Sequence, residues 1–85
     1  MSMVRELIAA VMAAEKNIDD QIAKLNAFAK QNDDIMREIT QALDGSSHQS
    51  ASNMQQRLSQ TQSEIAQTIR MLETSKGKLM RVRQL

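Results

Sequence analysis

The stretch from Asp44 to Ser52, DGSSHQSAS, decides the fold of this 85-residue chain. It separates two long runs in which an apolar residue recurs at nearly every seventh position, a repeat typical of helices that pack as a coiled coil. Before the break the row is Val4, Val11, Ile18, Leu25, Asn32 and Ile39, and after it Ala51, Leu58, Ile65, Leu72 and Leu79. We predict an all-α antiparallel two-helix hairpin, with helices over residues 3–43 and 51–83 and a turn over 44–50.

The composition permits long helices but only a small hydrophobic core. No Pro interrupts the chain, Phe28 is its one aromatic residue, and without Cys no disulfide can compensate for a thin core. The residues that we expect in the hairpin core are Val4, Val11, Ile18, Leu25, Phe28, Ile39, Leu58, Ile65, Leu72 and Leu79. Because this core is small, we expect the hairpin to complete a four-helix bundle, either by dimerisation or with a partner.

The apolar stripe of the first helix is wider than one antiparallel neighbour can cover. One flank of the seven-residue row is Leu7, Ala14, Phe28, Ile35 and Ala42, and the other is Ile8, Ile22, Ala29, Met36 and Leu43. The second helix has a single apolar face, which the hairpin itself should use. We therefore expect a helical partner to bind the flank formed by Ile8, Ile22, Ala29, Met36 and Leu43.

Asn32 stands where the row calls for an aliphatic side chain. In coiled coils a buried polar residue at such a position fixes register and oligomeric state while it lowers stability. A partly exposed interruption of the row is the other interpretation, and the sequence leaves both open.

Charge is divided between the two halves of the chain. Residues 1–44 carry five basic and eight acidic residues, a net charge of −3, whereas residues 45–85 carry six basic and two acidic residues, a net charge of +4. A basic tail closes the second helix and consists of Lys76, Lys78, Arg81 and Arg83. Cations there stabilise the negative end of the helix dipole, and an acidic partner surface or anionic lipid is the alternative. Nucleic acid is not expected as a ligand, because the total charge is only +1 and aromatic side chains that stack on bases are almost absent.

No catalytic, cofactor-binding or metal-binding set can be recognised, so we expect a protein that is not an enzyme and uses no cofactor. His48 is the only histidine and lies in the predicted turn, without the further His or Cys ligands that a metal site needs. The acidic pairs Asp19-Asp20 and Asp33-Asp34 are sequence neighbours, whose side chains do not face each other on a helix.

The segment Leu7–Ala14 (LIAAVMAA) is a candidate signal-peptide core. It is short, it follows Glu6, and no small-x-small cleavage site comes before Glu15, so we interpret it as the start of a helix. No stretch approaches the roughly 20 apolar residues that cross a bilayer. We expect a cytoplasmic protein without a cleavable signal peptide, which stays in the cell or is exported in complex with a partner.

The sequence Leu43-Asp44-Gly45, with a long helix on each side, resembles the midpoint of the WXG family of small type VII secretion proteins. Those proteins are helical hairpins of about this length with a Trp-x-Gly turn. Leu43 replaces the Trp, a variant similar to the small helical partners of LXG-type toxins. The family's C-terminal export motif needs a Tyr, which this chain lacks. The resemblance implies a targeting or chaperone-like subunit that binds the helical N-terminal region of an LXG-type effector, or a second WXG-like protein.

Two other functions stay open at this point. One is a self-assembling structural protein, either a homodimeric four-helix bundle or a filament subunit similar to type III needle proteins, although needle proteins typically have a proline-containing turn. The other is a peripheral membrane or nucleic-acid adaptor that acts through the basic tail.

Overall fold

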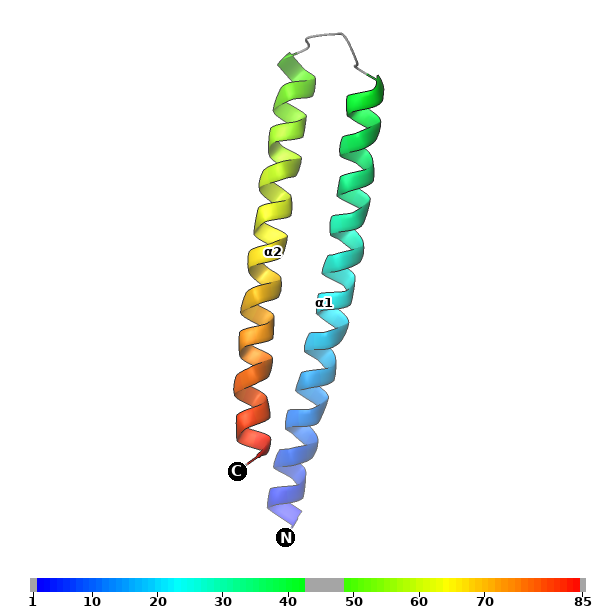
Figure 1. Cartoon of the computed structure of the whole chain (residues 1–85). Coiled ribbons are helices and arrows are strands. Elements are labelled where there is room, and N and C mark those ends of the chain that lie inside the picture. Colours follow the sequence, from blue (N-terminus) through cyan, green and yellow to red (C-terminus); the bar gives the residue numbers. More distant parts are fainter. Residues whose placement is uncertain (1, 43–48, 85) are drawn as a thin grey trace.

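The chain forms two long helices in a computed structural model that describes residues 2–42 and 49–84. Helix α1 spans Ser2–Ala42 and helix α2 spans Gln49–Arg83. The helices run antiparallel, side by side (Figure 1), and form a rod of 68 × 15 × 14 Å. The predicted all-α antiparallel hairpin is confirmed.

The predicted boundaries differ slightly from the observed ones. Helix α2 begins at Gln49, inside the predicted turn over residues 44–50, because Gln49 and Ser50 already have helical backbone. The predicted turn motif, formed by Leu43, Asp44 and Gly45, lies outside the described residues, as does His48. At the other end α2 continues past Gly77 to Arg83.

Both helices are continuous over their described residues, and several of their threonines bond to their own backbone. Helix α1 contains neither Gly nor Pro. Each of four threonines donates its hydroxyl to the carbonyl oxygen four residues earlier, over 2.9–3.0 Å: Thr40, Thr61, Thr68 and Thr74. The hydrogen that each hydroxyl donates is therefore used within its own helix, and Thr40 Oγ1 also accepts from Gln55 on the opposite helix.

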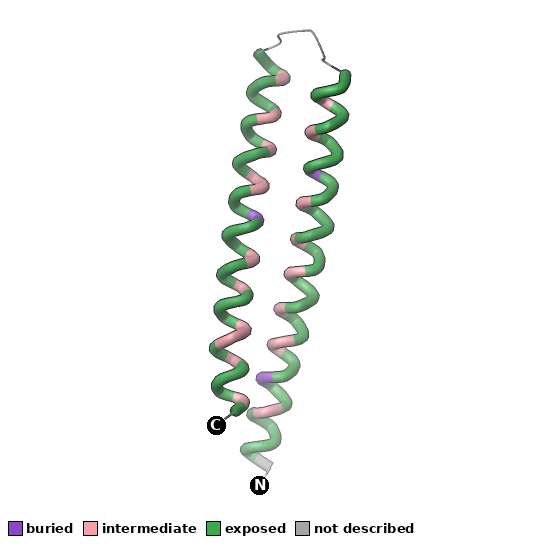
Figure 2. The backbone as a smooth tube through the Cα atoms, in the orientation of Figure 1, coloured by how far each residue is buried: buried purple, intermediate pink, exposed green. Residues whose placement is uncertain are grey.

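The two helices meet along one seam, whose positions alternate at spacings of three and four residues. The seam residues of α1 are Ile8, Val11, Glu15, Ile18, Ile22, Leu25, Ala29, Asn32, Met36 and Ile39. Those of α2 are Ala51, Gln55, Leu58, Gln62, Ile65, Ile69, Leu72, Lys76, Leu79 and Arg83. All are buried or half-buried, and the less exposed positions follow the facing sides of the two helices (Figure 2). This alternation is the heptad pattern of a coiled coil.

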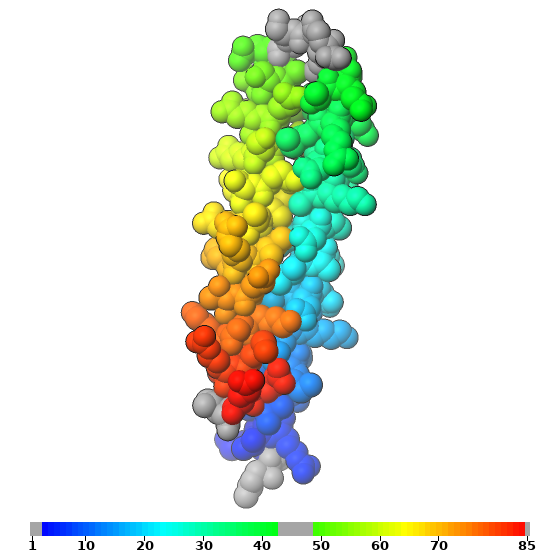
Figure 3. Space-filling model, viewed as in Figure 1, coloured from blue at the N-terminus to red at the C-terminus, as the bar shows by residue number. Residues whose placement is uncertain are grey.

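The core of the hairpin is thin. Among the described residues only Val11, Asn32 and Ile65 are buried, with 5–7% of their surface exposed. The other expected core residues that lie in the seam are half-buried: Ile18, Leu25, Ile39, Leu58, Leu72 and Leu79. Side chains fill the space between the ribbons (Figure 3), but each helix keeps most of its circumference exposed.

Two residues that we expected in the core are exposed, Val4 by 56% and Phe28 by 49%. Val4 lies 11 residues before Glu15, which pairs with Arg83 in the last turn of α2. At 1.5 Å per residue, Val4 is about 16 Å farther along the rod than Glu15, where α2 has ended. Phe28 lies beside the seam rather than in it. The expectation for these two residues was therefore wrong.

Candidate functional site

One side of the seam is cross-linked by polar contacts centred on Gln62. Its Nε2 donates to the carbonyl oxygen of Ala29 over 2.8 Å and to Oδ1 of Asp33 over 3.2 Å. Its Oε1 accepts from Nδ2 of the buried Asn32 over 3.3 Å. Of the two interpretations of Asn32, the structure therefore supports burial, with its Nδ2 bonded across the seam.

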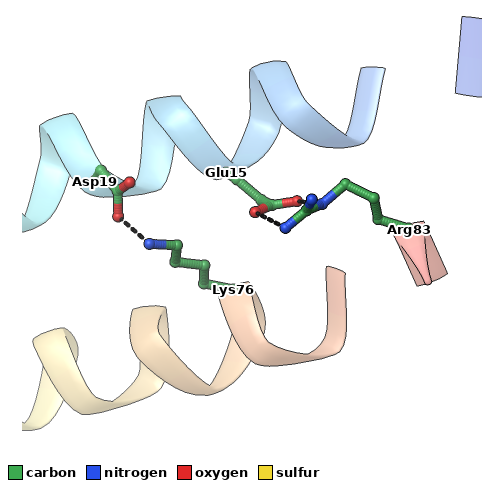
Figure 4. A network of polar contacts seen from close by, with 4 residues as sticks. All are labelled: Glu15, Asp19, Lys76 and Arg83. Atoms are coloured by element: carbon green, nitrogen blue, oxygen red, sulfur yellow. Dashed lines mark hydrogen bonds and ion pairs between the residues drawn. The ribbon is translucent and has the colours of Figure 1, made fainter. Parts of the chain in front are cut away.

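The same side carries three further contacts nearer the two ends of the rod. Gln55 Nε2 donates to Thr40 Oγ1 over 2.8 Å. At the opposite end (Figure 4), Arg83 contacts Glu15 through two hydrogen bonds, Nε to Oε1 at 2.8 Å and Nη2 to Oε2 at 3.3 Å. Lys76 Nζ lies 2.7 Å from Asp19 Oδ1.

These contacts define a polar flank of the hairpin. On α1 they involve Asp19, Asp33 and Thr40, which share one heptad position. Each directly follows a residue of what we call the Val11 row, the seam positions Val11, Ile18, Leu25, Asn32 and Ile39. Residues that share a heptad position lie on the same side of a helix. On α2 the seam residues that reach them are Gln55, Gln62 and Lys76, so this edge of α2 faces the same side of the hairpin.

The opposite flank carries five exposed large apolar side chains. On α1, Leu7, Phe28 and Ile35 are 54%, 49% and 43% exposed. They share the heptad position directly before the Ile8 row, the seam positions Ile8, Glu15, Ile22, Ala29 and Met36. On α2, the exposed residues Met54 and Val82 hold the equivalent position. It comes directly before the Gln55 row, the seam positions Gln55, Gln62, Ile69, Lys76 and Arg83. In an antiparallel pair these two positions lie on the same side of the seam, away from the polar flank. We call these five residues the apolar face.

Other exposed large apolar residues lie next to the apolar face or on the polar flank. Met3 and Met71 border the apolar face, whereas Met12 and Met80 lie on the polar flank. Monomeric proteins expose single apolar side chains routinely, but here five of them lie on one side of the hairpin, with Gln21, Thr61, Thr68 and Ser75 at the same heptad positions between them. Such a gathering indicates a surface for interaction.

The structure corrects the predicted partner-binding flank. Ile8, Ile22, Ala29 and Met36 are half-buried seam residues, and Leu43 lies outside the described residues. The physical reason is that a coiled-coil seam needs two rows per helix, and α2 packs between the Ile8 row and the Val11 row. The flank left exposed is therefore the one that begins with Leu7.

The basic tail divides in two. Lys76 and Arg83 occupy seam positions and form ion pairs with α1, whereas Lys78 and Arg81 are exposed. Sequence reasoning also missed Gln55 and Gln62 as seam residues. Their spacing could have identified them, since each lies three or four residues from Leu58. Because both side chains are polar, a search for apolar residues did not include them.

The described residues form no group of three or more potential metal ligands. Two shallow depressions each involve a single helix, one around Met36 and Thr40 and the other around Met71 and Thr74. Neither helix, over its described residues, is long and apolar enough to traverse a lipid bilayer. Over the described residues, both depressions thus lie on the side of a single helix and not between the two helices.

Comparisons of the chain with protein-family models, curated proteins and solved structures found no match.

Proposed function

We propose that this protein is a non-enzymatic helix-packing subunit, whose apolar face is covered by helices of another polypeptide. The observation that carries the proposal is the segregation of the two flanks: polar cross-links lie on one side, and Leu7, Phe28, Ile35, Met54 and Val82 are exposed on the other. Exposed apolar side chains spaced along one side of two adjacent helices fit an elongated partner, and helices supply such a shape.

The exposed area of the hairpin supports the same proposal. The chain exposes 6833 Å². A compact monomer of 9.6 kDa exposes about 5,100 Å². The excess of about 1,700 Å² exceeds the roughly 800 Å² that each partner buries in an interface of standard size. A partner on the apolar face would remove part of this excess.

For the partner we propose the helical N-terminal region of a larger effector, with this chain as its targeting or chaperone-like subunit in type VII secretion. This step rests on the resemblance at Leu43, Asp44 and Gly45. In this role the chain would stay in the cytoplasm or leave the cell bound to the effector.

The test is co-expression of the chain with its neighbouring genes, followed by affinity purification. Phe28→Asp and Ile35→Asp place a carboxylate on the apolar face and should abolish recovery of the companion, since an uncompensated buried charge is strongly unfavourable. Met12→Asp is the matched control, because Met12 is 54% exposed but lies on the polar flank. Recovery of the same companion with both face variants would overturn the proposal.

A second copy of the chain is the other candidate for the partner. The contacts Asn32–Gln62 and Thr40–Gln55 show which residues of the two helices lie at the same height along the rod. By this alignment Phe28 lies at about the height of Thr68, and Ile35 at about the height of Thr61. A copy related by a twofold axis along the rod would place Phe28 and Ile35 over these two small residues of its α2, the alternation that fills a bundle core. Light scattering at several concentrations tests this candidate, because self-association needs no companion.

A further inference from the structure

The end of the rod that carries the two termini differs in charge from the remainder. Residues 1–19 and 76–85 contain six basic and three acidic residues, a net charge of +3, whereas residues 20–75 contain five basic and seven acidic residues, a net charge of −2. Two of the three acids at this end, Glu15 and Asp19, are already paired with Arg83 and Lys76.

Four other cations at this end are exposed. They are Arg5, Lys16, Lys78 and Arg81, and none of them forms an ion pair with another described residue. They come from both helices and lie around the end of the rod rather than along one helix. Their charges are therefore free for an anionic ligand that is broad enough to contact several of them.

Exposed apolar side chains lie among these cations. Met3 is 81% exposed and Val4 56%, in the part of α1 that extends past α2, and Met12 and Met80 are 54% and 36% exposed on the polar flank. We call these four residues and the four cations the open-end patch. Binding to the interface of an anionic bilayer is strengthened both by apolar side chains that are buried there and by Lys and Arg that attract the lipid headgroups.

From the open-end patch we infer that the protein binds the surface of anionic lipid membranes through the end of the rod that carries its termini. Met3 and Val4, with Arg5 next to them in sequence, enter the boundary between headgroups and acyl chains, and Lys16, Lys78 and Arg81, roughly 16–21 Å farther back along the rod, are attracted to the anionic surface. Nucleic acid fits less well, because a phosphate backbone gives exposed Met and Val side chains nothing apolar to contact. The inference does not depend on the apolar face, and a partner there would leave Met12, Met80 and Arg81 accessible.

The experiment is sedimentation of the full chain with vesicles of phosphatidylcholine alone or mixed with an equal amount of phosphatidylglycerol. Wild type should bind only the mixed vesicles, less so as salt is added. The variant Lys78→Gln with Arg81→Gln should bind at least about threefold more weakly, since a cation at the surface contributes about fivefold and one set back from it contributes less. The matched control, Arg57→Gln with Arg70→Gln, removes the same charge from exposed positions of α2 outside the patch and should bind as wild type does.

Two further variants make the test specific. Met3→Ser with Val4→Ser should weaken binding at high salt, where the apolar contribution dominates, and circular dichroism should show unchanged helix content. Phe28→Asp should bind vesicles as wild type does, which separates this inference from the proposed helical partner. Absence of binding to mixed vesicles, or equal loss in the Arg57/Arg70 control, would overturn the inference.

Discussion

The side-chain amide of Asn32 in α1 donates to Oε1 of Gln62 in α2 over 3.3 Å, and Asn32 is 5% exposed. Gln62 in turn donates to the carbonyl oxygen of Ala29, so the polar layer is joined to the backbone of the opposite helix. A slip of one heptad would separate Asn32 from Gln62 and place Gln62 against Leu25 or Ile39, whereas Asn32 would meet Ile69 in one direction and Gln55 in the other. The pair therefore disfavours slipped registers, because Gln62 loses its polar partner in both.

Replacing the polar layer by the combined variant Asn32→Leu and Gln62→Leu should raise the free energy of unfolding by about 1–2 kcal/mol. Apolar side chains would be buried in place of a hydrogen bond whose net contribution is small. Urea unfolding followed by circular dichroism measures the change. The control, Gln41→Leu with Gln60→Leu, adds the same side chains at exposed positions and should change stability little. A less stable Asn32/Gln62 variant would show that the polar layer is net stabilising.

The ion pair between Glu15 and Arg83 should contribute measurably to stability. Its side chains are 12% and 35% exposed and share two hydrogen bonds, whereas Arg37 and Asp34 are 3.8 Å apart and largely exposed. Glu15→Gln should lower the free energy of unfolding by about 1 kcal/mol. Asp34→Asn, the matched control, should have almost no effect. A double-mutant cycle with Arg83→Gln measures the coupling, and a coupling near zero would contradict this expectation.

Gly77 is a site for stabilisation. It lies inside α2, and a Cβ added there meets no atom within 4 Å. Gly77→Ala should therefore raise the free energy of unfolding by about 1 kcal/mol through helix propensity alone. The reverse change at an exposed position of the same helix, Ala66→Gly, should lower it by a similar amount. Thermal unfolding of the two variants checks both signs, and a destabilised Gly77→Ala variant would mean that this position is occupied in the assembled protein.

Ile22 and Phe28 should respond differently to the same substitution. Ile22 is a half-buried seam residue, so Ile22→Asp should destabilise the hairpin by roughly 3 kcal/mol and reduce its helix content. Phe28 lies on the apolar face, so Phe28→Asp should retain helix content and lose only association. Equal loss of helix content in both variants, measured by circular dichroism, would show that Phe28 packs in the hairpin core and not on an exposed face.

The seven-residue row predicted the fold because it needs only periodicity. It placed two helices and identified seam residues such as Val11 and Ile65, since an apolar repeat of seven can be buried against only one neighbour. It could not decide which flank α2 covers. Leu7 and Ile8 are adjacent in sequence and similar in hydrophobicity, and the choice depends on the rotation of α1 about its axis.

The polar seam residues could not be predicted from the sequence for a related reason. Gln55, Gln62, Lys76 and Arg83 bury their aliphatic stems in the seam and present their polar groups to partners on α1. Hydropathy assigns such side chains to solvent, because the pairing that allows their burial involves residues about 15 to 68 positions away in the chain.

The central claim is that the apolar face is covered in the assembled protein, and a single fluorescent probe tests it most directly. The chain has no Trp, so a Phe28→Trp variant reports on the apolar face and a Met12→Trp variant on the polar flank. Emission should be measured together with molecular mass, for the purified chain and for the complex recovered by co-expression. We predict that in the associated protein the Phe28→Trp variant emits at shorter wavelength than the Met12→Trp variant, and that its emission moves to longer wavelength on dissociation. Solvent-exposed emission from both variants, in a stable species with the mass of one chain at every concentration and with no companion recovered, would contradict the account.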